Sequence, residues 1–325
     1  MRALLMLVVL AFLGWSGWWW VASGAARSGA EAALTRMQAQ GWQAGHAGLS
    51  VAGYPNRIDL TLTDPHLATP DGRWGWRAAF AQVFALSYKP WHLIAAFAPE
   101  QQIETPAGPW RLAAARLQSS LVLVPGTALA LDRFNLAGEA LALDGALRGG
   151  AETLSLATRP AAGQALAHDI GLDLRGVTID PRLLALLPPG LLPERAEVLR
   201  LDAVAGFAAP LDRAALEALP PLTDLTLREL RGEWGPIRLH LSGRLTPDAA
   251  GLAEGRLALR LEGAAQALDV AVAAGLIAPE ARASWAQVLA ALAPGGQPLD
   301  VPLRLSGGRI ALGPLTLGPA PRLVW

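Results

Sequence analysis

The sequence predicts a mainly β protein with a few helices (α+β), in which an N-terminal transmembrane helix precedes a large curved antiparallel sheet domain. Two observations support this class. No charged side chain occurs between Arg2 and Arg27, and beyond that segment apolar and polar residues alternate in many short runs separated by Gly, Pro and Asp. Strands do not alternate with helices along these runs, so a parallel βαβ sheet is not expected.

Residues 1–26 are expected to form a transmembrane signal anchor, because the hydrocarbon core of a bilayer needs roughly 20 apolar residues of helix. Tryptophan favours the membrane–water interface, and four tryptophans gather at the far end of the segment: Trp15, Trp18, Trp19 and Trp20. Arg2 and the terminal amine favour a cytoplasmic N-terminus. The prediction is a single-pass protein of the inner membrane whose domain faces the periplasm. A cleavable signal peptide is the alternative, since Ala22-Ser23-Gly24 offers small residues for cleavage.

Residues 27–41 are expected to form a membrane-proximal helix. Apolar residues recur there at helical spacing, and Gly41 is a natural end. The apolar stripe belongs either to a plain stalk or to a helix that docks on the domain; it consists of Ala30, Ala33, Leu34 and Met37.

The remaining chain, 42–325, is expected to be one periplasmic β-rich domain, with a division into halves 42–210 and 211–325 left open. Ile58, Leu60 and Leu62 alternate with polar residues, which is typical of a half-buried strand. Similar runs predict further strands over 79–88, 92–97, 101–104, 110–124, 129–131, 141–143, 154–156, 170–174, 222–230, 235–245, 255–261, 301–305 and 309–312.

Four short helices interrupt this pattern. Asp180 and Pro181 are start signals for a helix over 182–187, which Pro188-Pro189-Gly190 ends. This leucine-rich segment is either an apolar lid over a groove or a loop on the open end of a sheet. The other expected helices cover 211–219, 264–276 and 279–292.

Composition excludes several classes of function. A net charge of zero with 17% charged residues argues against a nucleic-acid partner. The absence of cysteine excludes disulfides, thiol nucleophiles and Cys–metal sites. No zinc-protease, nucleophile-elbow, P-loop or dinucleotide motif occurs, and no histidine lies within four residues of another. We therefore predict no catalytic residue, no metal site and no cofactor, and expect a protein that is not an enzyme.

Short motifs hold both tyrosines of the chain and one tryptophan–glycine pair. Their residues are Gly53, Tyr54, Pro55, Arg57, Tyr88, Pro90, Trp91, Trp234 and Gly235. Together with the Leu-Gly-Pro triplets at 312–314 and 317–319, their order and spacing resemble the family catalogued as domain of unknown function 2125, found in Gram-negative bacteria. That family has no established activity, so the resemblance implies location and shape, and the motif residues are expected to be structural.

Two functions remain open at this point. The architecture is also distantly similar to AsmA-like envelope proteins, which implies an anchor in the inner membrane and a curved periplasmic sheet with an apolar trough. The first hypothesis is a non-enzymatic protein that holds a lipid or another apolar ligand in such a trough. The alternative is a structural or adaptor domain of the cell envelope with a protein partner. An uncovered apolar sheet face would favour the first.

Overall fold

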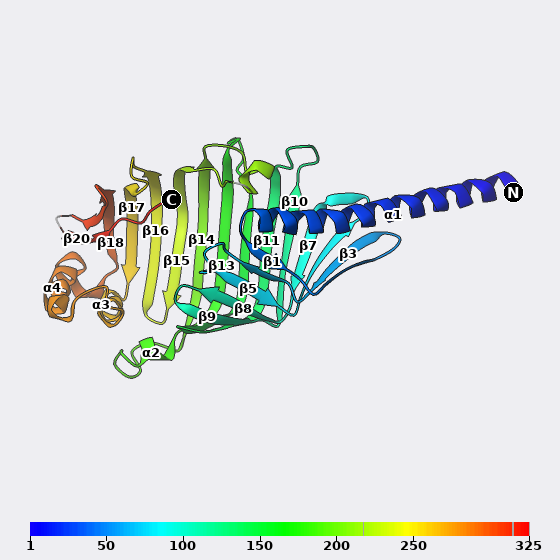
Figure 1. Ribbon diagram of the computed structural model, residues 1–325. Coiled ribbons are helices and arrows are strands. Elements are labelled where there is room, and N and C mark those ends of the chain that lie inside the picture. Colours follow the sequence, from blue (N-terminus) through cyan, green and yellow to red (C-terminus); the bar gives the residue numbers. More distant parts are fainter. Residues whose placement is uncertain (217, 314, 325) are drawn as a thin grey trace. The chain divides into compact units, whose positions relative to one another are not determined.

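The computed structural model describes residues 1–216, 218–313 and 315–324 (Figure 1). Its internal contacts divide the chain into two compact units. Unit 1 comprises Met1–Pro125 and Leu136–Leu147, and unit 2 comprises Gly126–Asn135 and Arg148–Trp325, whose last residue lies outside the described part. These units have other boundaries than the halves 42–210 and 211–325 that the sequence left open. Both units are built mainly of antiparallel strands, which confirms the predicted class.

Helix α1 (Arg2–Ala39) runs without a break through the expected anchor and the expected membrane-proximal helix. It is long and apolar enough to cross a membrane. Gly41 follows at φ 87°, a left-handed conformation that glycine adopts readily. From its middle onward α1 contacts β1, β2 and β3 of unit 1 through a half-buried stripe at helical spacing, so the helix docks on the domain. The stripe consists of Ser16, Trp19, Ala22, Ser23, Ala26, Ala30, Leu34 and Met37, and leaves Ala33 exposed.

Unit 1 contains ten complete strands and the C-terminal part of an eleventh. Their bounds are β1 (Gln43–Gly45), β2 (Gly48–Ala52), β3 (Arg57–Thr63), β4 (His66–Ala68), β5 (Gly75–Ala78), β6 (Phe80–Leu86), β7 (Lys89–Phe97), β8 (Glu100–Thr105), β9 (Gly108–Ala113), β10 (Arg116–Leu123) and β11 (Leu131–Asp144). They pair antiparallel in two ladders, ordered β2–β3–β6–β7–β10 and β1–β4–β5–β8–β9–β11.

The chain passes from one ladder to the other through short bends that carry alanine. Ala78, Ala98 and Ala114 lie at three of these bends and are at most 4% exposed. Where strands turn out of one sheet layer into another, their backbones approach closely and only a small side chain fits. The expected single strand over 110–124 is wrong for this reason, because it bends at Ala114 and Ala115 into β9 and β10.

The described residues of unit 2 form nine further strands and several short helices. The strands are β12 (Arg148–Pro160), β13 (Ala167–Thr178), β14 (Arg195–Phe207), β15 (Leu222–Trp234), β16 (Ile237–Pro247), β17 (Ala253–Glu262), β18 (Leu299–Ser306), β19 (Arg309–Leu312) and β20 (Leu315–Pro319). The helices are α2 (Pro181–Leu184), α3 (Ala264–Ala273), α4 (Arg282–Leu292) and the 3-10 turns η1 (Arg213–Leu216), η2 (Pro279–Ala281) and η3 (Pro294–Gly296).

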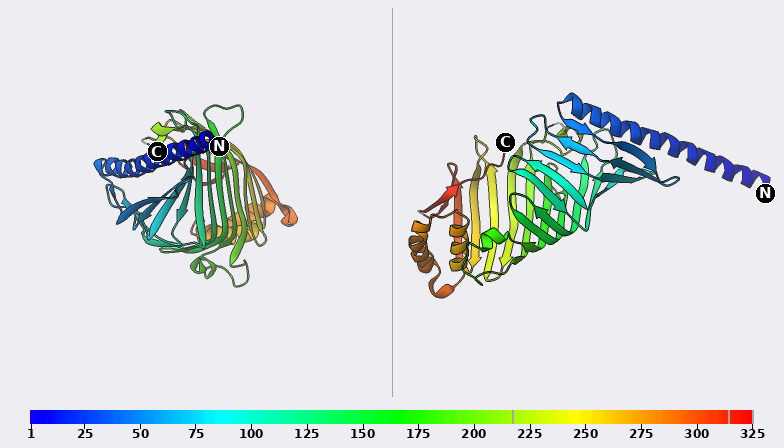
Figure 2. Two further views of the ribbon diagram at one scale, coloured as in Figure 1. Left: turned by 90° about the vertical axis from the view of Figure 1, so that its right-hand side faces the viewer. Right: turned by 60° about the horizontal axis from the view of Figure 1, so that its bottom comes forward.

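The unit 2 strands pair in chain order, each antiparallel to the next, from β12 to β20. The result is a curved sheet that does not close on itself (Figures 1 and 2). A buried cluster of Leu245, Ala253, Leu305 and Ala320 lies near one end of the β16–β19 strands. The C-terminal segment contributes to it, because Ala253 donates its N–H to the carbonyl of Pro321 at 2.8 Å.

The local predictions hold in part in both units, and in unit 2 the 13-residue strand β14 was not predicted. The expected helices over 264–276 and 279–292 are found within a few residues as α3, η2 and α4. Helix α2 is shorter than expected, and the expected helix over 211–219 is only the turn η1, with Glu217 outside the described residues. In unit 1 the short strands β1, β4 and β5 were not predicted, since three or four residues are too few to show a period.

Asp180 caps α2 and holds the neighbouring chain. Its carboxylate accepts the backbone N–H groups of Arg182 at 2.7 Å and Arg148 at 2.8 Å, and the Arg182 guanidinium donates to it at 2.8 Å. The side-chain hydrogen bond from Arg182 is the largest of the effects that hold the pKa of Asp180 well below its usual range.

We expect Asp180→Asn to destabilise unit 2 at neutral pH and to flatten its stability profile in acid. A carboxyl whose folded pKa is depressed contributes stability above its unfolded pKa of about 3.8, and this is lost as pH falls through the folded value. Thermal unfolding followed by circular dichroism from pH 7 to pH 2 measures this. The Asp248→Asn change, at the β16–β17 turn of the same unit, is the control. An unchanged acid slope in Asp180→Asn would contradict the expectation.

Candidate functional site

The sheet of unit 2 has one strongly charged face. Antiparallel pairing aligns Arg159 with Asp169, Arg200 with Asp173 and with Arg231, and Arg238 with Glu262 across neighbouring strands. Ion pairs cross this face: Arg238–Glu262 at 3.1 Å, Arg244–Asp224 at 3.1 Å, Arg200–Glu229 at 3.7 Å and Arg260–Asp300 at 3.9 Å. Each is solvated and contributes little alone, but together they keep this face in water.

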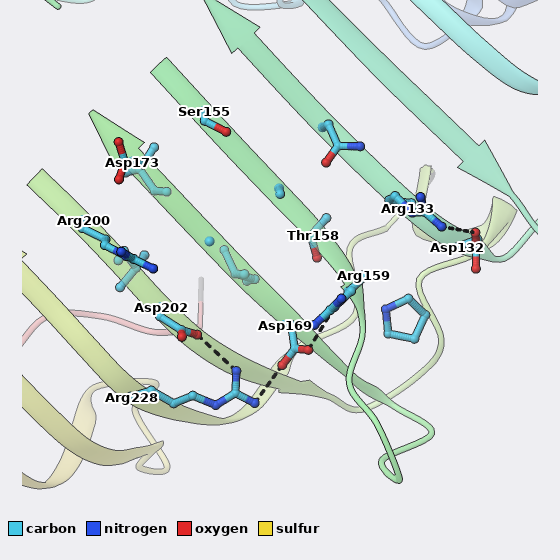
Figure 3. A pocket seen from close by; sticks show the side chains of 17 residues that line it. Asp132, Arg133, Ser155, Thr158, Arg159, Asp169, Asp173, Arg200, Asp202 and Arg228 are labelled. Atoms are coloured by element: carbon cyan, nitrogen blue, oxygen red, sulfur yellow. Dashed lines mark hydrogen bonds and ion pairs between the residues drawn. The ribbon is translucent and has the colours of Figure 1, made fainter. Parts of the chain in front are cut away.

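A hollow of about 830 Å³ lies on the charged face (Figure 3). Asp169 is at its centre, where it accepts Arg228 at 2.8 Å and Arg159 at 3.4 Å, while Arg228 also reaches Asp202 at 3.1 Å (Figure 3). These hydrogen bonds, first the one that Arg228 donates to Asp169, raise the pKa of Arg228. The charged residues that line the hollow balance: Asp132, Asp169, Asp173 and Asp202 against Arg133, Arg159, Arg200 and Arg228. Because the charges satisfy one another, the hollow has no excess charge to attract an ionic ligand.

The opposite face of the same sheet is apolar. Antiparallel register joins one residue from each of seven consecutive strands into a row of aliphatic side chains, called here the central row. It consists of Leu156, Leu172, Leu201, Leu230, Leu241, Leu259 and Val301. Strands lie about 4.8 Å apart, so the row extends roughly 29 Å across the sheet.

A second row runs parallel to the central row, two residues along each strand. It consists of Leu154, Leu174, Leu199, Gly232, Leu239, Leu261 and Leu299. Gly232 interrupts the leucines and leaves a gap in the middle of this row. The two rows make a continuous aliphatic surface, because side chains two apart on a strand share a face.

Burial of the apolar face is greatest at two places. On the side toward the C-terminal segment, Ala205 is 1% exposed and Leu305 is 3% exposed. In the second row Leu299 is also buried, at 2% exposed, whereas Leu199 in the same row is 37% exposed. All seven members of the central row are only half-buried. The C-terminal cluster therefore covers one margin of the apolar face and leaves the central row and most of the second row accessible.

His168 marks the margin of this face. Asp169 is on the charged side of β13, so the two neighbours point in opposite directions, as alternation requires. The His168 ring is 6% exposed and packs edge-on against Phe207, with centroids 6.3 Å apart. Burial lowers the pKa of His168, so the imidazole is neutral in an apolar setting.

Unit 1 has an apolar hollow of its own, of about 530 Å³, on the β8–β9 ladder. Trp74, Ile103, Trp110 and Leu143 line it together with the turn residues Thr105, Pro106 and Ala107. Trp74 is 54% exposed, so the hollow is open to the surroundings.

Four of the motif residues, Gly53, Tyr54, Pro55 and Arg57, lie in the first of two hairpin turns that meet α1. Gly53 has φ 98°, and a Cβ there would be 2.8 Å from the carbonyl oxygen of Arg57, so only glycine fits the turn. Arg57 pairs with Asp59 and its guanidinium lies over the Phe84 ring, 5.8 Å from the centroid. The peptide between Tyr54 and Pro55 is cis.

Three indoles of α1 donate to backbone carbonyls of these turns, an arrangement called here the anchor clamp. Trp15 donates to Pro55 at 3.0 Å, Trp18 to Ser87 at 3.2 Å and Trp19 to Arg57 at 2.6 Å. The Tyr54 hydroxyl meets Ser16 Oγ at 2.8 Å, and its ring packs edge-on against Trp19. Ser87 joins the two turns, because its N–H and hydroxyl both donate to the carbonyl of Asn56.

The remaining motif residues divide between the two units. Tyr88 lies with Ser87 in the β6–β7 turn, next to Pro90 and Trp91 at the start of β7. Trp234 and Gly235 belong to the β15–β16 turn of unit 2. There the Trp234 indole donates to the carbonyl of Pro193 at 2.8 Å, and Gly235, at φ 56°, donates its N–H to Glu197. Pro314 lies outside the described residues.

A family model for an uncharacterized protein conserved in bacteria, domain of unknown function 2125, matches residues 19–321. The chain belongs to this family. No curated protein and no solved structure matches it. The region that matches the domain of unknown function 2125 includes every motif residue named above and begins at Trp19, inside the anchor clamp.

Sequence reasoning missed Ser87 and the partners of the tryptophans. Ser87 is 1% exposed and joins the two turns through a backbone carbonyl, an acceptor that every residue carries and no sequence motif marks. A usable signal was present in α1: Trp15, Trp18 and Trp19 are spaced i, i+3, i+4 and therefore share one helix face. In the described part of the chain, no group of three acidic or histidine side chains could hold a metal ion.

Proposed function

We propose that this chain is an inner-membrane protein, anchored by α1 with its domain in the periplasm, that holds a lipid acyl chain or a similar apolar ligand on the two leucine rows of unit 2. The observation that carries the proposal is the half-burial of all seven side chains of the central row. Apolar surface left in water costs roughly 25 cal/mol per Å². A surface built from two rows of leucine therefore favours a hydrophobic cover.

The dimensions of the rows suit an acyl chain. One leaflet of the hydrocarbon core is about half of 30 Å thick, and the central row is about 29 Å long, so an extended acyl chain fits within it. The missing side chain at Gly232 deepens the second row at its centre. The paired charges on the opposite face hold that side in water, which leaves the apolar face as the side for the ligand.

The membrane location rests on α1 alone. The helix is uncharged from Ala3 to Ala26, and the few charges at its start favour a cytoplasmic N-terminus. A membrane tether would keep the leucine rows next to a source of lipid. The protein would then act by binding rather than by a chemical reaction.

Photocrosslinking tests the ligand directly. The full chain is expressed in cells fed a fatty acid that carries a diazirine in its acyl chain, and adducts are mapped by mass spectrometry after irradiation. We expect adducts on peptides of β13–β17 that hold the central row. Leu241→Asp, which introduces a charge into that row, should abolish them. Ala258→Asp, on the charged face of the adjacent strand, is the matched control and should keep them.

Circular dichroism must show that both variants fold. Adducts confined to α1, with none on β13–β17, would overturn the proposal and leave an adaptor domain whose protein partner covers the rows. Equal adducts in Leu241→Asp and the wild type would place the ligand elsewhere and also overturn it.

A further inference from the structure

The anchor clamp fixes the depth at which two hairpin turns of unit 1 meet the helix. The turns are residues 53–57, between β2 and β3, and residues 86–90, between β6 and β7. Their carbonyls accept the indoles of Trp15, Trp18 and Trp19, so the turns lie beside that stretch of α1. Wherever this stretch lies in the membrane, the two turns lie at the same level.

Helix geometry sets that level. With a rise of 1.5 Å per residue, Trp15 is about 18 Å along the helix from Ala3, and Trp19 about 24 Å. The hydrocarbon core is about 30 Å thick. If Ala3 lies at the inner boundary of that core, the clamped tryptophans end about 6–12 Å short of its outer boundary. The bilayer must then thin locally for them to reach the outer interfacial layer, and they do not reach the water beyond it. Tilt of the helix would place them deeper still.

The turns carry the residues that suit an interfacial layer. Tyr54 is 48% exposed although its hydroxyl is bonded to Ser16, so its ring faces outward. Tyr88 is 51% exposed, and Lys89 beside it is exposed as well. Tyrosine places an apolar ring and a polar tip across the interface, and a lysine ammonium attracts lipid phosphate.

We infer that these two turns form a second membrane contact: they insert among the lipid headgroups of the leaflet that α1 leaves, with Tyr54, Tyr88 and Lys89 against lipid. The contact rests on the proposed anchoring of α1 but not on the acyl-chain ligand of unit 2. It would fix the orientation of unit 1 relative to the membrane, which a helix with a free stalk would not do.

The absence of cysteine allows a depth measurement with single labels. Cysteine is introduced at exposed sites in the full chain: Asn56→Cys and Lys89→Cys in the two turns, and Val8→Cys in α1. Ala107→Cys, in the exposed β8–β9 turn of the same unit, is the matched control. Each variant carries a bimane label and is reconstituted in phosphatidylcholine–phosphatidylglycerol vesicles that contain spin-labelled lipid.

We expect headgroup-attached spin labels to quench positions 56 and 89, deep acyl-chain labels to quench position 8, and neither to quench position 107. Iodide in the water should quench position 107 most and position 8 least. If positions 56 and 89 behave like 107 while position 8 is quenched, the second contact is overturned and the anchor stands. If position 8 also escapes quenching by lipid, the anchoring of α1 fails, and this inference fails with it.

Discussion

Gly255→Ala should unfold unit 2 at a much lower temperature than the wild type. Gly255 has φ 145°, and a Cβ there would lie 2.2 Å from the carbonyl oxygen of Arg244 on the adjacent strand β16. A residue with a side chain is strained in this conformation by about 1–3 kcal/mol before the clash is counted. Since backbone cannot move aside as a side chain can, we expect a loss of at least about 3 kcal/mol, which lowers Tm by roughly 6–12 °C.

Gly232→Ala is the matched control for this change. It lies in the same sheet, its φ needs no glycine, and the nearest atom to an added Cβ is 3.9 Å away. Thermal unfolding of both variants in detergent, followed by circular dichroism, gives the comparison. Two variants of equal stability would contradict the close approach of β16 and β17 at this point. Gly243 lies on β16, where an added Cβ would be 2.2 Å from the Arg256 carbonyl oxygen on β17. Gly243→Ala should therefore lower Tm in the same way as Gly255→Ala.

Leu305→Ala should destabilise unit 2 by about 2–5 kcal/mol, because it removes a buried side chain and leaves a cavity. Leu305 is 3% exposed and packs in the cluster with Leu245, Ala253 and Ala320. At roughly 2–4 °C per kcal/mol, the expected fall in Tm is about 4–20 °C. This cluster covers one margin of the apolar face, so its loss should also expose that margin to water.

Leu292→Ala provides the control for the leucine truncation. Leu292 ends α4 and is 45% exposed, and surface substitutions usually change stability by less than about 0.5 kcal/mol. A Leu305→Ala variant as stable as Leu292→Ala would show that the C-terminal segment does not hold the cluster closed.

The two sites proposed here separate two tasks within one chain. The anchor clamp and its turns belong to unit 1, and the leucine rows belong to unit 2. A substitution in one site can therefore be tested without disturbing the other site. Leu241→Asp, for example, should leave the quenching of a label at position 89 unchanged. The family match includes both sites, since it runs from residue 19 to residue 321.

The predictions that held were those decided by local chemistry. The uncharged run from Ala3 to Ala26 predicts a helix that can cross a membrane, because the bilayer fixes the length of such a segment. Alternation of Leu with charged residues predicts strands, because a pleated strand sends neighbours to opposite faces. The Asp180–Pro181 start signal predicted α2 for the same kind of reason: a cap acts within three residues.

Other features depended on contacts that sequence spacing does not encode. The sequence predicts that Leu172 and Leu230 each lie on an apolar strand face, but only the structure shows the strand β14 with Leu201 and aligns the three residues in one row. The bends at Ala98 and Ala114 are set by a neighbouring sheet layer and leave the local apolar pattern unbroken. The tryptophans of α1 signal an interface, yet their partners are backbone carbonyls, which have no residue identity. The sequence by itself therefore determined the helix, most of the longer strands and the two-faced character of the sheet. The tertiary structure decided register, bends and the anchor clamp, since each is a hydrogen-bonded contact between residues far apart in the chain.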